Sequence, residues 1–207
     1  MARKTKEDTE HTYALLLDAA ESVFALKGVA ATTLNDIAVA AGMTRGAIYW
    51  HFKDKADLFN AMMDRVTLPL EESLDSAALS DAKDPVGEIR AALLEALRRT
   101  AHDEQTRRVF EVATHKVEYV EELEAVQQRH LRARNHWLDR TRQAMESAAR
   151  QSGDKLPIAV NTAALGLHVM VTGLIQNWLL DQHAFDLLAV GRQTIDTYLA
   201  GLGLAPA

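Results

Sequence analysis

The stretch of sequence that decides the fold runs from Thr33 to Phe52 and reads TLNDIAVAAGMTRGAIYWHF. Apolar residues recur at helical spacing on both sides of Gly42, and a threonine stands before each run. Threonine side chains cap helix N-termini, and glycine accepts the positive φ of a tight turn. The stretch therefore predicts two short helices joined at a glycine turn, which is the geometry of a helix-turn-helix.

The chain on both sides of this stretch predicts further helices. Residues Thr9 to Leu26 carry apolar side chains at helical spacing, and Gly28 suits the position just beyond a helix end. A longer helix opens after Phe52, and we expect Pro69 to kink or end it.

The remaining sequence continues the helical pattern. Asp84 followed by Pro85 is a helix start signal, because aspartate caps and proline suits the first helical position. Apolar spacing then predicts helices over 84–97, 104–114, 118–150, 157–180 and 185–202. We therefore expect an all-α fold of about nine helices.

The charge of the chain is unevenly distributed. The formal net charge is −6, which is unusual for a protein that binds nucleic acid. Residues 1–55 hold seven basic and seven acidic residues, so the rest of the chain carries the whole excess of negative charge. An acidic second region limits non-specific adhesion to nucleic acid, and the net charge therefore does not exclude a DNA-binding N-terminal region.

One face of the second short helix carries residues suited to DNA. Arg45 stands near the helix N-terminus, where its guanidinium can form two hydrogen bonds with the edge of a guanine. Gly46 allows close approach to the groove floor, and the threonines stand at helix starts, where phosphates bind well. The basic tail of Arg3, Lys4 and Lys6 can add further contacts. The predicted DNA-binding residues are Thr33, Thr44, Arg45, Gly46, Tyr49, His51 and Lys55.

Residues 32–38 and 44–55, together with the helix end at 24–29, resemble the tetracycline-repressor (TetR) family of transcriptional regulators. The basic start and the block TRGAIYWHF are similar to the acriflavine-resistance branch, whose members repress multidrug efflux pumps. The resemblance implies an all-helical homodimer whose last two helices form a four-helix interface. The absence of cysteine fits a cytoplasmic location. The resemblance also implies a (pseudo)palindromic double-stranded operator, and a hydrophobic small-molecule effector that releases it. The corresponding domains are 1–53 for DNA binding and 54–207 for effector binding and dimerisation.

The second domain contains candidates for the effector pocket that the resemblance implies. His168, Thr172 and Gln176 follow one another at helical spacing within an otherwise apolar segment. Without the resemblance, such a stripe is better explained by hydrogen bonds across a helix packing. The predicted ligand-binding residues are Phe110, Thr114, His136, Trp137, Arg140, His168, Thr172 and Gln176.

Two further features of the sequence are typical of other functions. The uncharged stretch 156–180 is long enough to span a bilayer, but its polar residues favour a buried helix and no membrane association. Glu111, His115, Glu118 and Glu122 share a helical face, which is better explained by solvation than by a metal.

Catalytic signatures are equally scarce. The chain has no cysteine, and it has no nucleophile-elbow, zinc-protease or phosphate-loop motif. We therefore expect neither an enzyme nor a cofactor. The remaining alternative is an architectural or division-control protein that binds DNA without an effector.

Overall fold

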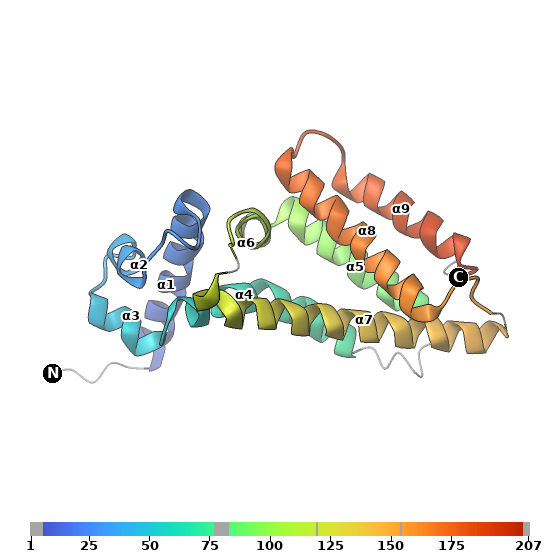
Figure 1. Ribbon diagram of the computed structural model, residues 1–207, viewed down its shortest axis with the longest axis horizontal. Coiled ribbons are helices and arrows are strands. Elements are labelled where there is room, and N and C mark those ends of the chain that lie inside the picture. Colours follow the sequence, from blue (N-terminus) through green and yellow to red (C-terminus); the bar gives the residue numbers. More distant parts are fainter. Residues whose placement is uncertain (1–5, 77–82, 119, 154, 205–207) are drawn as a thin grey trace. The chain divides into compact units, whose positions relative to one another are not determined.

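The computed structural model describes residues 6–76, 83–118, 120–153 and 155–204 (Figure 1). Within these residues the chain forms only helices and turns, which confirms the expected all-α fold. The elements are α1 (Lys6–Lys27), α2 (Leu34–Ala40), α3 (Arg45–His51), α4 (Lys55–Ser76), α5 (Pro85–His102), α6 (Glu104–His115), the 3-10 helix η1 (Glu121–Leu123), α7 (Glu124–Ser152), α8 (Val160–Leu180) and α9 (Leu187–Gly201).

The described chain forms two compact units. Unit 1 combines Met1–Val66 with Arg108–His130, and unit 2 combines Thr67–Arg107 with Leu131–Ala207. Three helices, α4, α6 and α7, pass from one unit into the other. These units follow spatial contacts, whereas the division at residue 53 concerns function and stays a prediction.

The core of unit 1 is built where the first four helices meet. The buried face of α1 includes Leu16, Ala20 and Phe24, and the Phe24 ring lies 6.0 Å from the ring of Phe59 on α4. Ile48 of α3 is fully buried against this core. Each large apolar side chain buried in this way stabilises the fold by about 1.5–3 kcal/mol.

Unit 2 is organised around three helices that pack together, α5, α8 and α9 (Figure 1). Gly191 of α9 permits close approach to α5, because a Cβ at this position would lie 2.3 Å from Cδ1 of Leu97. The Arg90 guanidinium of α5 also forms a bidentate ion pair with the Asp196 carboxylate of α9, with N–O distances of 2.5 and 2.8 Å. The pair contributes orientation as well as attraction, since both guanidinium N–H groups are aligned with one carboxylate.

Some helix bounds differ from those predicted. Of the two outcomes expected at Pro69, a kink or an end of the helix, the end is excluded, because α4 continues to Ser76. The predicted long helix from residue 118 begins only at Glu124, because the chain first makes a 3-10 turn that buries Leu123 in the unit 1 core. Helix α8 begins at Val160 rather than at Pro157.

Helix α8 is the one helix in the described ranges that is long and apolar enough to cross a membrane. The core helix of a water-soluble protein satisfies the same criteria of length and composition, so this finding is weak evidence for a membrane. Only 33% of its most apolar window is buried within the chain, and much of that window therefore remains accessible.

Candidate DNA-binding site and sensor residues

Helix α2 is held at its start by a reciprocal cap. The Asp36 N–H donates to the Thr33 hydroxyl oxygen at 3.1 Å, and the Thr33 N–H donates to the Asp36 carboxylate at 2.9 Å. Hydrogen bonds from the Thr33 hydroxyl and backbone, and from Lys27, lower the pKa of Asp36 to about 2. The cap satisfies backbone groups that a helix end leaves open, so it fixes where α2 begins.

The turn between α2 and α3 depends on Gly42. Its φ of 68° lies in the left-handed region, where a side chain would be strained. The next residue, Met43, donates its N–H to the Ala38 carbonyl at 2.8 Å. Helix α3 then starts at a second cap, in which Ala47 donates its N–H to the Thr44 hydroxyl at 3.3 Å. The predicted two-helix geometry is confirmed.

The outward face of α3 presents the residues predicted to read DNA. Thr44, Arg45, Gly46 and Tyr49 are all exposed, whereas Ile48 points into the core. The Arg45 guanidinium carbon lies 5.4 Å from the Tyr49 ring centroid, a cation–π distance. The tyrosine therefore orients the arginine along the helix face.

Gly46 has no packing requirement within the chain. A Cβ at this position would have its nearest neighbour, the Thr44 hydroxyl, at 4.0 Å. Its φ is not positive either, so neither space nor backbone conformation explains a glycine here. The lack of a side chain instead clears the outer face of α3, as close approach to a groove requires.

The side chains of His51 and Lys55 both contact other residues of unit 1. The half-buried His51 ring lies 5.8 Å from the Tyr13 ring and 4.6 Å from the Trp50 ring. Lys55 donates to the Ala30 carbonyl at 3.0 Å and pairs with Glu122. Both residues hold the local fold, and their contact with phosphate stays a prediction.

Our sequence-based prediction omits one residue of this face. Trp50 is 69% exposed, the indole resting edge-on against His51. Its position about 200° around the helix from Ile48 points it away from the core, so helical periodicity could have identified it. Trp50 therefore adds an exposed aromatic ring to the face that carries Tyr49.

The basic tail is described only in part. Arg3 and Lys4 lie outside the described residues. Lys6 begins α1 and pairs with Glu10 at 3.7 Å, but both side chains are largely exposed. Such a pair adds little stability and leaves the Lys6 charge accessible to solvent.

The predicted ligand residues are divided between the two units. Phe110 and Thr114 of α6 belong to unit 1, where Phe110 packs against the hydrophobic core and both are half-buried. The other six belong to unit 2, namely His136, Trp137 and Arg140 on α7 and His168, Thr172 and Gln176 on α8.

The polar stripe of α8 differs in exposure along its length. His168 and Thr172 are half-buried, whereas Gln176 is exposed. Burial, and next the positive charge of Arg134, lower the pKa of His168, which favours its neutral form near neutral pH. The Thr172 hydroxyl donates to the His168 carbonyl at 2.9 Å. The Thr172 hydroxyl therefore already donates a hydrogen bond within α8.

A surface hollow of about 470 Å³ lies between α7 and α8. None of the predicted ligand residues lines it. Its lining residues are Asn135, Leu138, Asp139, Arg142, Asn161, Ala164 and Leu165. The described residues also contain no group of three or more acidic, histidine or cysteine side chains placed to hold a metal ion.

Comparisons with known proteins agree with this architecture. Residues 16–62 match the family model of bacterial regulatory proteins of the tetR family, and residues 84–203 match the C-terminal region of MAATS-type transcriptional repressors. The chain is 37% identical to the probable transcriptional regulator ArpR of Pseudomonas putida, over 100% of this chain and 99% of the relative.

Solved structures extend the likeness to the fold. NalD, the secondary repressor of the MexAB-OprM multidrug efflux pump in Pseudomonas aeruginosa, superposes with a TM-score of 0.86 at 33% identity, covering 94% of this chain and 98% of NalD. SmeT of Stenotrophomonas maltophilia in complex with triclosan superposes with a TM-score of 0.80 at 31% identity, covering 92% and 90%. The chain therefore belongs to the TetR family of bacterial regulatory proteins.

Proposed function

We propose that this protein is a ligand-responsive transcriptional repressor that binds a (pseudo)palindromic operator and controls a multidrug efflux operon. The observation that carries the proposal is the outward face of α3, where Arg45 and Gly46 stand beside the capped helix start. An arginine there can reach a guanine edge, and a bare backbone beside it allows α3 to enter the major groove. The relatives NalD and SmeT, which are repressors of multidrug efflux pumps, support the choice of operon.

The operator is bound by a homodimer in this proposal. Leu165, Val169 and Leu180 of α8 are large apolar side chains that remain exposed in the single chain. A second copy of the chain would cover them through α8 and α9, as isologous interfaces do. Two recognition helices related by a two-fold axis then match two operator half-sites about one DNA turn apart.

The effector is a hydrophobic small molecule held by the second domain. The proposal is supported by His136, Trp137 and His168, which all belong to unit 2 and are half-buried, since such sites combine apolar side chains with a few polar ones. SmeT has been solved in complex with triclosan, which makes triclosan a suitable first probe. Ligand binding would favour a state whose recognition helices no longer fit the operator. Such a switch operates where the DNA is, in the cytoplasm.

Titration of the full-length protein against its own upstream DNA tests the proposal. We expect saturable binding to a (pseudo)palindrome by a dimer, weaker operator binding in Arg45→Ala, and unchanged operator binding in Gln176→Ala. Triclosan should weaken operator binding by the wild type. If no hydrophobic drug in a panel changes operator affinity, the control of an efflux operon is wrong.

A second candidate is a DNA-binding protein without an effector. It is favoured by one observation, that Phe110 packs against the unit 1 core and none of the predicted ligand residues lines the hollow. Tryptophan fluorescence separates the two, since Trp137 is half-buried and Trp178 buried in unit 2. A change in emission on adding drugs supports the repressor, whereas no change across drugs and metabolites supports the second candidate.

A further inference from the structure

Glu21 is a carboxylate buried in the middle of α1. It is only 1% exposed and lies on the same face of the helix as Leu17 and Phe24. A buried carboxylate is strongly disfavoured unless it is paired, because desolvation removes its hydration. The surroundings of Glu21 must therefore supply positive charge.

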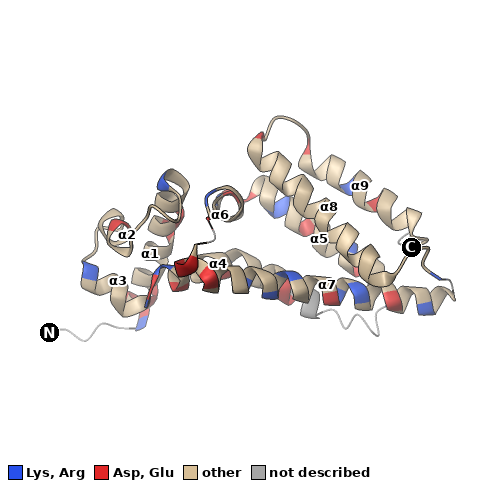
Figure 2. Ribbon diagram, viewed as in Figure 1, with Lys and Arg blue, Asp and Glu red and all other residues tan. Residues whose placement is uncertain are grey.

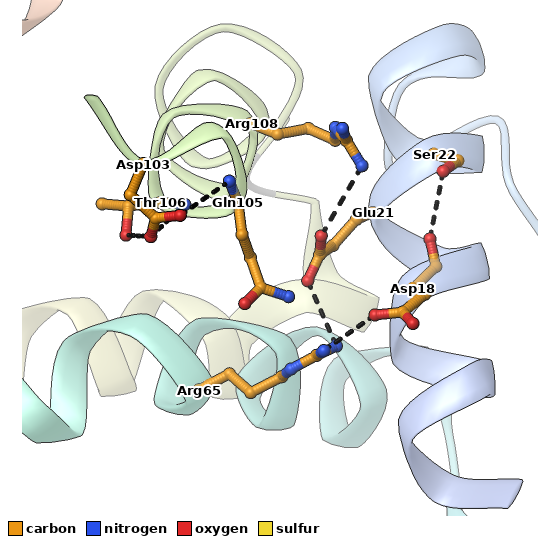
Figure 3. A network of polar contacts seen from close by, with 8 residues as sticks. All are labelled: Asp18, Glu21, Ser22, Arg65, Asp103, Gln105, Thr106 and Arg108. Carbon is orange, nitrogen blue, oxygen red and sulfur yellow. Dashed lines mark hydrogen bonds and ion pairs between the residues drawn. The ribbon is translucent and has the colours of Figure 1, made fainter. Parts of the chain in front are cut away.

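Two arginines from different helices supply that charge (Figure 3). Nη1 of Arg65 on α4 lies 3.3 Å from Oε1 of Glu21, and Nη1 of Arg108 on α6 lies 3.9 Å from Oε2. One carboxylate thus joins α1 to α4 through one oxygen and to α6 through the other. All three residues belong to unit 1.

The links from Glu21 to α4 and to α6 differ in whether a second carboxylate of α1 supports them. Arg65 also pairs with Asp18 on α1 at 2.7 Å, so the connection between α1 and α4 has a second carboxylate. Asp18 is largely exposed, and no pair between it and Arg108 occurs. Loss of the Glu21 charge therefore weakens the link to α6 while the Asp18–Arg65 pair remains.

Helix α6 is continuous across the boundary between the two units. Its residues up to Arg107 belong to unit 2, and those from Arg108 onward belong to unit 1. Beyond its end, the Lys116 carbonyl accepts a hydrogen bond of 2.9 Å from the N–H of Val29, in the loop that leads to α2. A displacement of α6 would therefore reach both α1 and the helix-turn-helix, since a helix moves largely as a rigid rod.

We infer that Glu21 is a positioning residue, whose negative charge ties the C-terminal half of α6 to α1 and α4 so that the recognition helix follows α6. The inference rests on the proposed function only in its ligand response; the attachment of α6 is a property of the chain by itself. Glu21 touches neither DNA nor effector in this role. Its charge, rather than its volume, makes the connection.

The test compares two matched variants in the full-length protein. Glu21→Gln keeps the size of the side chain and removes the charge, whereas Asp18→Asn removes the other carboxylate on Arg65. Hydrogen exchange followed by mass spectrometry should be faster by about tenfold in residues 108–116 of Glu21→Gln. It should stay at the wild-type rate there in Asp18→Asn, and in α5, α8 and α9 of both variants. Wild-type exchange at 108–116 in Glu21→Gln would overturn the inference.

A second measurement separates positioning from a purely structural role. The ratio of operator Kd with and without triclosan should fall towards one in Glu21→Gln, while operator affinity without triclosan and the fluorescence response to triclosan are kept. A Glu21→Gln protein that responds like the wild type would overturn the inference. If triclosan does not change operator binding by the wild type, that result counts against the proposed effector. Hydrogen exchange alone then tests the role of Glu21.

Arg108→Gln covers the case in which Glu21→Gln fails to fold. This variant leaves Glu21 paired with Arg65 and removes the Arg108–Glu21 link to α6. The same local increase in exchange at 108–116 is expected, and its absence would overturn the inference.

Discussion

Lys55 at the start of α4 and Glu122 in η1 form an ion pair, with 2.5 Å between Nζ and Oε1. The same ammonium donates to the carbonyl of Ala30, and the Lys55 side chain is only 14% exposed. Lys55 thus joins the loop before α2 to the turn before α7, within unit 1. A lysine used in this way stabilises the loop before α2 within unit 1, and need not contact phosphate.

Removing either partner of this pair distinguishes the two roles. We expect Lys55→Gln and Glu122→Gln each to lower the free energy of unfolding by about 1 kcal/mol, because the pair is only partly shielded from water. Operator affinity measured against salt should keep the wild-type slope in both variants. A phosphate contact by Lys55 would instead reduce the slope by about 0.9 in Lys55→Gln alone.

We expect Arg45 to contribute most to the preference for the operator over random DNA. Arg45→Ala should weaken operator binding by about 1–3 kcal/mol, while binding to random DNA changes little, because a contact with a base edge is lost. Fluorescence anisotropy with both DNAs measures this difference. Arg132→Ala, which removes an exposed arginine of α7, serves as the control and should bind the operator normally. An equal loss on operator and random DNA would mean that Arg45 contacts only the backbone.

The cap of α2 should make stability depend on acid pH. The pKa of Asp36 is lowered from 3.8 to about 2 in the folded protein, so folding favours its ionised form. That contribution is present above the unfolded pKa and is lost as pH falls towards the folded one. Urea unfolding should therefore find Asp36→Asn less stable than the wild type at neutral pH, with the difference disappearing between about pH 4 and pH 2.

Thr33→Ala is the matched control for this effect. It removes the hydroxyl that both donates to and accepts from Asp36. Combining it with Asp36→Asn should cost less than the sum of the single changes, because the two residues form one cap. A difference between wild type and Asp36→Asn that persists at low pH would contradict the ionic explanation.

Close packing of α8 against α9 depends on Gly166. A Cβ there would lie 2.3 Å from the Tyr198 hydroxyl oxygen, and that hydroxyl donates to the Ala163 carbonyl at 3.0 Å. Gly166→Ala should therefore lower the free energy of unfolding by about 1–3 kcal/mol through overpacking. Thermal unfolding of the full-length protein measures the change.

The Tyr198→Phe background supplies the control. Removing the hydroxyl leaves the ring carbon Cζ, at 3.1 Å, as the nearest atom to a Cβ on Gly166. The cost of Gly166→Ala should therefore be smaller in Tyr198→Phe than in the wild type. An unchanged cost would show that the clash does not involve the hydroxyl.

Some elements were predictable because their determinants are local. The caps at Thr33 and Thr44 and the turn at Gly42 act over three or four residues, and the structure forms all three as expected. Helical spacing likewise places Gly46 opposite the buried Ile48, and the structure leaves Gly46 exposed. The start of α7 was wrong by several residues, because the burial of Leu123 in the core outweighs the helical preference of the residues before it.

The sequence by itself determined the helix-turn-helix and the residues on its outward face, since short-range hydrogen bonds and helical periodicity suffice for both. Only the tertiary structure decided what Glu21 and Lys55 do. Their charges are neutralised by Arg65, Arg108 and Glu122, which lie far away along the chain. No spacing rule connects such positions, because burial and pairing depend on which helices pack together. In unit 1 that packing also attached the end of α6 to the DNA-binding helices, which the order of residues along the chain does not reveal.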